Sequence, residues 1–204
     1  DKTKIIYSVY NDGKEHIASE IDIDYLLENT KVNIPITTND FIINTDRNGE
    51  QIASDIASAK DGSFTVVWQD DYDGNNSYQI YAAGFNSDGT KRWGDITVNT
   101  NSAGQQYNPC IAMEDDGFFV VCWEDDHDKN GLYQIFAAGF NSNGTKKWGD
   151  ITINENSAGQ QKNPAVAMTD DGSFVVVWED DNDKNDVFQI YAAGFDPDGN
   201  KSWG

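Results

Sequence analysis

The sequence predicts an all-β fold made of three successive four-stranded antiparallel sheets. Three observations carry this prediction: a 55-residue repeat, short strand-like runs separated by turns that contain Gly, and strands that are apolar on both faces. A fixed period of this length is typical of repeat architectures. All six tryptophans occupy two positions of the repeat, each recurring every 55 residues: Trp68, Trp123 and Trp178 at the first, and Trp93, Trp148 and Trp203 at the second.

The copies run without a gap over residues 40–94, 95–149 and 150–204, and each begins with Asp and ends with Trp-Gly. Residues 1–39 are less regular. Within them, residues 4–13 and 21–23 weakly resemble part of a copy. We therefore interpret 1–39 as a half blade, or alternatively as a linker or a small capping hairpin.

The first two strands of each copy form a predicted hairpin. In the first copy we expect them at 52–59 and 64–68, with Asp61-Gly62 in the turn between them. Asp-Gly favours a tight hairpin because Gly accepts a positive φ. The second strand recurs at 119–123 and 174–178.

The third strand of the first copy is expected at 79–85, and a turn at 86–89 leads to a fourth strand that follows Trp93 into residues 95–99. No helical period competes with this pattern. Ala82 and Gly84 are small, which predicts that a neighbouring sheet approaches the third strand closely.

The second strand is apolar on both faces, since Phe64, Val66 and Trp68 alternate with Thr65 and Val67. Such a sheet must be covered on both sides. Sheets of four strands and about 50 residues stacked face to face are the blades of a β-propeller. A three-fold β-prism or trefoil is the alternative.

Three blades are fewer than the about four to eight of closed propellers. The chain is therefore expected to be part of a longer propeller or to be completed by oligomerisation. Residues 40–45 look like a fourth strand placed ahead of its own blade. This offset suits a strand exchanged between chain ends or between subunits.

Composition excludes two classes of partner. The formal net charge is −21, so a nucleic-acid surface is not expected, because phosphates are bound by Lys and Arg. No apolar run approaches the roughly 18 residues of a membrane span. The hydrophobic fraction of 38% still allows a packed core.

An acidic loop follows the second strand of every copy, and its Asp-x-Asp-x-Asn spacing matches an oxygen-rich Ca²⁺ loop. Ala82, Ala137 and Ala192 stand where an EF-hand carries its Glu, so an EF-hand is excluded. Solvated turns are the alternative, since Asp and Asn are ordinary turn residues. The predicted ligands are, loop by loop, Asp71, Asp73, Asn75 and Gln79; Asp126, Asp128, Asn130 and Gln134; and Asp181, Asp183, Asn185 and Gln189.

The runs 175–181, 189–199 and 201–204 (VVVWEDD, QIYAAGFDPDG and KSWG) resemble tandem repeats of exported bacterial and archaeal surface proteins. That resemblance covers 40–204 and implies propeller blades, adhesion modules nearby and an extracellular or cell-surface location. The acidic loops are similar to the calcium loops of integrin α-subunit propellers, which implies Ca²⁺ as the cofactor.

Cys110 and Cys122 lie on the first two strands of the second copy, nearly symmetric about Asp116-Gly117. They are candidates for a cross-strand disulfide in an oxidising compartment, or for two buried thiols.

The near-equivalence of the copies predicts a secreted or cell-surface, calcium-stabilised module for adhesion or ligand binding, and not an enzyme. One alternative is a self-assembling extracellular subunit of a filament or sheath, joined by strand exchange. The other is a carbohydrate-binding or carbohydrate-active propeller. The expected partners are a further copy or further repeats, or a surface glycan or protein.

Overall fold

The computed structural model describes residues 8–11, 14–17 and 40–204, and the chain divides into two compact units, 1–41 and 42–204. In the first unit, β1 (Ser8–Asn11) and β2 (Lys14–Ile17) form a two-stranded antiparallel ladder. Most of the predicted half blade or capping hairpin lies outside the described residues. No helix among the described residues is long and apolar enough to cross a membrane.

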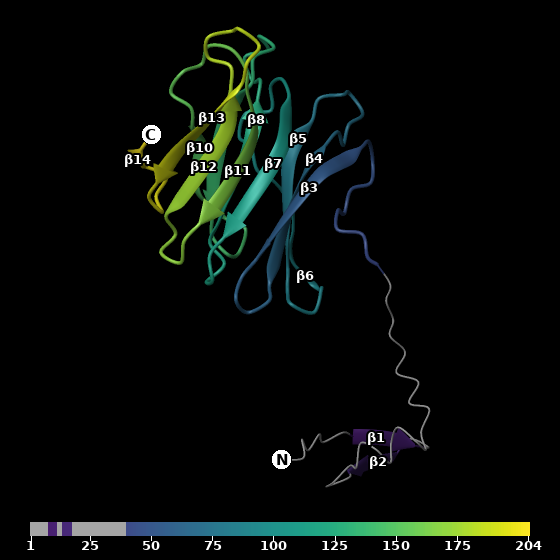
Figure 1. Cartoon of the computed structure of the whole chain (residues 1–204). Helices are drawn as coiled ribbons and strands as arrows, with labels where there is room; N and C mark the ends of the chain where they lie inside the picture. Colours follow the sequence, from purple (N-terminus) through teal and green to yellow (C-terminus); the bar gives the residue numbers. More distant parts are fainter. Residues whose placement is uncertain (1–7, 12–13, 18–39) are drawn as a thin grey trace. The chain divides into compact units, whose positions relative to one another are not determined.

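The second unit contains three separate four-stranded antiparallel sheets, which stand side by side in chain order (Figure 1). We call these sheets blades 1, 2 and 3. The predicted all-β, propeller-like class is confirmed, because four consecutive strands pair within each sheet. Blade 1 comprises β3 (Gln51–Ser58), β4 (Phe64–Asp70), β5 (Gln79–Phe85) and β6 (Lys91–Thr97); blade 2 comprises β7 (Gln106–Met113), β8 (Phe119–Asp125), β9 (Gln134–Phe140) and β10 (Lys146–Thr152); blade 3 comprises β11 (Gln161–Met168), β12 (Phe174–Asp180), β13 (Gln189–Phe195) and β14 (Lys201–Trp203).

The first strand of each blade lies against the first strand of the next, β3 against β7 and β7 against β11. Each of these strands carries a bulge at a residue with left-handed backbone, namely Ala53, Asn108 or Asn163. Pro109 and Pro164 follow two of them. Proline has no N–H to give to a ladder, so it is tolerated at a bulge.

Two hydrophobic clusters join the blades face to face, as the two-sided apolar pattern predicts. Ile80 on blade 1 packs with Phe119 and Trp123 on blade 2. Ile135 on blade 2 packs in the same way with Trp178 on blade 3. Each blade thus buries apolar area against a neighbouring blade, and blade 1 also has a smaller cluster of its own around Trp68 and Phe85.

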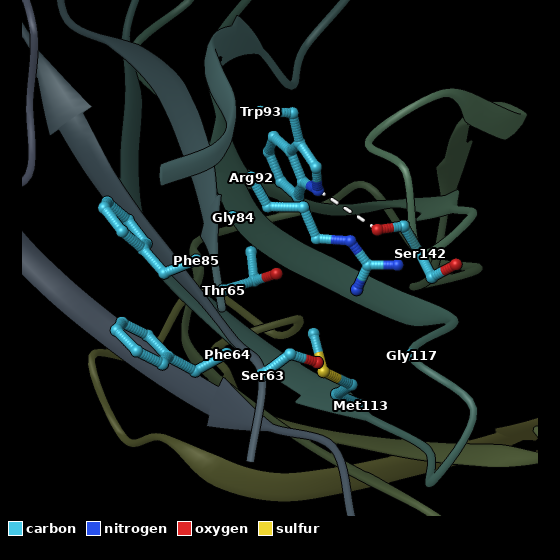
Figure 2. Close-up of a pocket in the computed structure, with 10 residues that line it drawn as sticks. All are labelled: Ser63, Phe64, Thr65, Gly84, Phe85, Arg92, Trp93, Met113, Gly117 and Ser142. Carbon is cyan, nitrogen blue, oxygen red and sulfur yellow. Dashed lines mark hydrogen bonds between the residues drawn. The ribbon is translucent and has the colours of Figure 1, made fainter. Parts of the chain in front are cut away.

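In blades 1 and 2 the tryptophan of the outer strand, Trp93 or Trp148, reaches across to the next blade. Trp93 stacks on Phe119 with ring centroids 5.8 Å apart. Its Nε1 donates a hydrogen bond of 3.1 Å to the carbonyl oxygen of Ser142 (Figure 2). The crevice around this contact has a volume of about 10 Å³, room for no more than one water molecule. The indole fills the space between the blades.

The same indole explains Gly84, and here the prediction needs correction. A Cβ at Gly84 would lie 2.2 Å from the Trp93 ring. The small residue therefore accommodates the tryptophan of the adjacent strand in its own blade, not the approach of another sheet.

The outer strand begins earlier than predicted, at Lys91 rather than after Trp93. The repeat boundaries at 94/95 and 149/150 consequently fall inside β6 and β10. The strand predicted at 40–45 is not formed, because residues 40–45 carry no ladder pairing among the described residues. Thr45 nevertheless donates its N–H to Asp95 Oδ2 at 2.6 Å, as Thr100 does to Asp150.

Candidate functional site

The acidic loops and the loops that enter the next blade are joined at one end of the sheets. Ser77 Oγ donates to the carbonyl oxygen of Gly104 at 2.7 Å, and Gln105 Nε2 donates to the carbonyl oxygen of Asn76 at 2.6 Å. Gln160 repeats the second bond to Gly131 at 2.7 Å. We call this end, formed by residues 71–78, 98–105, 126–133, 153–160 and 181–188, the loop face.

Each acidic loop is organised by its first Asp. Asp71, Asp126 and Asp181 are buried. Asp71 accepts the N–H of Asn76 at 3.0 Å, and Asp126 accepts the N–H of Gly131 at 3.1 Å. A buried carboxylate that accepts backbone N–H groups fixes the path of the loop.

The next two predicted metal ligands bond to each other in every loop. Asn75 donates to Asp73 at 2.7 Å. The same bond recurs, at the same length, between Asn130 and Asp128 and between Asn185 and Asp183.

The fourth predicted ligand turns toward the outer strand. Gln79 Oε1 accepts from Asn99 at 2.7 Å, and Gln134 Oε1 accepts from Asn154 at 2.7 Å, whereas Gln189 is exposed. Within the described part of the chain, no three His, Cys, Asp or Glu side chains gather as a metal-holding group. Calcium binding stays a prediction.

Cys110 and Cys122 face each other as register partners on β7 and β8, and both are free thiols. Burial and the contact with Cys110 raise the pKa of the Cys122 thiol. Whether the two oxidise to a disulfide stays a prediction.

A row of three tyrosines, two in the loop face and one on the adjoining strand β7, was missed by the sequence analysis. Tyr107, the second residue of β7, lies between Tyr78 and Tyr133, and its ring centroid is 5.6 Å from each of theirs. All three rings are half-buried. We call Tyr78, Tyr107 and Tyr133 the tyrosine row. Beyond it, Lys162 Nζ lies 4.1 Å from the ring centroid of Phe188.

Carboxylates flank the tyrosine row. The Tyr78 hydroxyl donates to Glu50, and this bond is the main reason that its pKa rises to about 12. Burial, followed by Tyr107, Asp126 and Glu124, raises the pKa of Tyr133 to about 12. The phenols therefore stay neutral and can donate hydrogen bonds throughout the physiological range.

Glu124, the register partner of Tyr107, connects blades 2 and 3. Its carboxylate is 4% exposed and accepts from Asn108 Nδ2 at 2.8 Å and from the N–H of Asn163 at 2.7 Å. It thereby fixes the bulges of two neighbouring first strands. Gln69 occupies this position in blade 1 and accepts the N–H of Asn108 at 3.1 Å.

A groove of about 380 Å³ opens beside blade 2, and Asp125, His127, Phe136 and Asp150 contribute to its wall. His127 Nδ1 lies 2.8 Å from Asp125 Oδ1, and the imidazole meets Phe136 edge-on at 5.4 Å. The other copies carry Tyr72 and Asn182 in place of His127. The three copies are therefore not chemically equivalent on the loop face.

No protein-family model matches the chain, and no curated protein matches it. Among solved structures, a protein of unknown function from Dyadobacter fermentans aligns with a TM-score of 0.55 and 11% identity over 79% of this chain and 56% of that one. An N-acetylgalactosamine deacetylase from F. plautii aligns with a TM-score of 0.51 and 12% identity over 76% and 51%. An endo-arabinase from Bacteroides thetaiotaomicron gives 0.45 and 17% over 71% and 54%.

The chain thus spans about half the length of the structures that it matches. At these identities the likeness concerns the fold, which is propeller-like. It also corrects one prediction. The expectation that the chain is not an enzyme is wrong as an inference from similar copies, because the F. plautii deacetylase shares this kind of fold. Near-equivalent blades do not exclude an active site, because the loops of the copies differ, as at His127.

Proposed function

We propose that the chain is a carbohydrate-binding or carbohydrate-active section of a propeller and that the saccharide lies on the tyrosine row. The observation that supports this most is the continuity of the row, in which three neighbouring phenol rings come from two blades. Binding sites are built from aromatic side chains with a few polar groups placed among them, and the row with its carboxylates has this composition.

The chemistry of a sugar fits these groups. One face of a sugar ring is lined with C–H groups and can stack on an aromatic face, while hydroxyl groups at the edge donate to carboxylates. Glu50 already accepts from Tyr78 in this way. The net charge of −21 disfavours anionic glycans. We therefore propose a neutral or amino sugar.

One structural neighbour supports the choice of ligand class. The deacetylase from F. plautii was solved in complex with blood group B trisaccharide, and its TM-score is 0.51. At 12% identity it supports a saccharide as the ligand class without identifying which sugar.

The test is calorimetric titration of the chain with neutral oligosaccharides, first selected on a glycan array. Tyr107→Ala should weaken binding at least about tenfold. We take as a guide the stacking of a nucleic-acid base on one aromatic side chain, which is worth about 1–3 kcal/mol. Tyr72→Ala, an exposed tyrosine outside the row, is the control and should leave the affinity unchanged. Equal affinities for the Tyr107→Ala variant and the unaltered chain would contradict the proposal.

The same glycan then separates binding from catalysis. After incubation, new reducing ends or released acetate would identify the row as part of a substrate site. An intact glycan that remains bound would identify a binding module.

A cell-surface location and calcium stabilisation remain proposals beside this one. The support for calcium is the threefold Asp-x-Asp-x-Asn spacing and the buried first Asp of each loop. A secreted adhesin that recognises surface glycans would combine all of these features.

A further inference from the structure

We propose that a second copy of this chain packs head to tail against blade 3, with its blade 1 covering the open face. The first observation is that residues at the same repeat position are buried in blades 1 and 2 but exposed in blade 3. Ile80 and Ile135 are 0% exposed because the next blade covers them, whereas Ile190, the same position in blade 3, is 74% exposed. Val177 likewise is 36% exposed, whereas Val67 is fully buried.

Blade 1 carries the other half of the same contact. Inside the chain, the covering side of a blade presents Ile111, which is 6% exposed. Its equivalent on blade 1 is Ile56, which is 59% exposed. The two outer faces of the stack are therefore the two sides of an interface that the chain already forms twice internally.

The tryptophan contact shows the same complementarity. Trp93 lines the narrow crevice between blades 1 and 2 (Figure 2). It also stacks on Phe119. Trp203 is 53% exposed, and the hollow around it and Phe174 measures about 280 Å³, against about 10 Å³ for the filled crevice. On blade 1, Phe64 is the equivalent of Phe119 and is only half-buried.

A segment of blade 1 could also pair with the outer edge of blade 3. In blade 1, Ile80 accepts the N–H of Val98 at 2.7 Å and donates to Asn99 Oδ1 at 2.8 Å. In blade 3, β14 pairs with β13 at Gly194 and Phe195, and within the described residues no ladder partner lies on the outer side of 189–191.

Residues 42–45 occupy the repeat positions of 97–100 and are already held in a matching way. Ile43 packs on blade 1, and its carbonyl oxygen accepts from Lys91 at 2.8 Å, as that of Val98 accepts from Lys146 at 2.6 Å. In the assembly, Ile43 and Asn44 of the second copy bond Ile190 of the first. They take the places that Val98 and Asn99 have beside Ile80.

The stoichiometry follows from the blade count. Two copies give six blades, within the range of about four to eight for closed propellers. Two equal head-to-tail contacts close into a ring when the rotation permits. This inference does not depend on the proposed saccharide site.

Sedimentation equilibrium of the full chain tests the proposal. We expect twice the monomer mass at micromolar concentration. Ile190→Lys should give a monomer with an unchanged circular dichroism spectrum, because Ile190 is 74% exposed and lies outside the hydrophobic clusters of the described residues. Asp170→Asn makes the same charge change at an exposed turn and should remain a dimer.

A mixing experiment distinguishes head-to-tail packing from symmetric pairing of two blade 3 faces. Ile56→Lys alone should also be monomeric. A mixture of the Ile56→Lys and Ile190→Lys chains retains one of the two contacts and should form a heterodimer weaker than the unaltered dimer. A monomeric unaltered chain, a dimeric Ile190→Lys chain or a mixture without heterodimer would each overturn the proposal.

Discussion

Single residues at the loop face show how this acidic chain keeps buried carboxylates. Trp68 Nε1 donates to Asp70 Oδ2 at 2.9 Å, and this bond recurs in the other blades at 2.9 and 3.0 Å. Asp70 is 2% exposed, so the indole N–H replaces water that burial removes. Each second strand therefore ends at a fixed point, from which the acidic loop starts.

Glu114 is a residue whose burial is less well compensated. It lies in the turn between β7 and β8. Burial, a hydrogen bond with Asp116 and the charge of Asp116 raise its pKa from 4.5 to about 7. A raised folded-state pKa means that the folded protein holds the proton more tightly than the unfolded chain does. The contribution of protonated Glu114 to the free energy of unfolding is therefore lost as pH rises from about 4.5 to 7.

Glu114→Gln should remove this pH dependence. At pH 8 we expect the variant to be about 1 kcal/mol more stable than the unaltered chain, after allowance for solvent screening of a partly exposed group. At pH 4 the two should be equally stable. Urea unfolding at both pH values provides the comparison, and a gain of equal size at pH 4 would refute the assignment to Glu114 ionisation.

Among the elements, the third and outer strands of each blade are fitted together by a glycine beneath a tryptophan. Gly139 pairs across to Trp148, and a Cβ there would lie 2.3 Å from the indole. Trp148 in turn stacks on Phe174 of blade 3 at 5.7 Å. The position of one glycine thus affects both the sheet and the contact between blades.

Gly139→Ala should therefore destabilise the fold by about 1–3 kcal/mol, the usual cost of overpacking. Gly149→Ala is a matched control, since a Cβ there meets nothing within 4 Å. It should change stability by less than about 1 kcal/mol. Denaturant midpoints of the two variants decide the matter; similar losses in both would show that the indole is not the cause.

Most strands could be predicted, because their alternating apolar pattern and Gly-containing turns recur three times. Residues 79–85 were predicted to form a strand and are β5. The strand at 40–45 was not found because a strand needs a pairing partner, which no sequence pattern provides. The tyrosine row was missed because Tyr78 and Tyr107 belong to different blades. The aromatic residue before each third strand, Tyr78, Tyr133 or Phe188, was the available signal.

Gln79 shows a different limit of the sequence argument. Its spacing from Asp71 fits a ligand position, yet its side chain bonds Asn99 of the outer strand. The spacing of residues within a loop does not show whether a more distant residue, here Asn99, bonds the predicted ligand instead.

The whole molecule combines a net charge of −21 with two apolar end faces, one on blade 1 and one on blade 3. Negative charge repels itself and destabilises a compact state. Bound cations and further blades are two ways to offset this, by neutralising the loops and by burying the apolar end faces. The calcium and assembly proposals therefore belong to the molecule as a whole.

Calcium should raise the thermal unfolding midpoint relative to EDTA. One occupied site adds about 2.7 kcal/mol to the free energy of unfolding when free calcium is at a hundredfold excess over the dissociation constant. A triple variant, Asp73→Asn, Asp128→Asn and Asp183→Asn, should abolish the difference. The control triple, Asp88→Asn, Asp115→Asn and Asp170→Asn, removes the same charge at exposed turns and should retain it. An equal response of both triples would indicate general screening rather than loop sites.

The most direct measurement of the central claim is a nuclear magnetic resonance titration of ¹³C-labelled tyrosine rings with a neutral oligosaccharide. The chain has nine tyrosines, which can be assigned by substitution. We predict saturable shifts for Tyr78, Tyr107 and Tyr133 and none for exposed Tyr72. Shifts at Tyr72 without shifts in the tyrosine row, or no response to any neutral saccharide, would contradict the account.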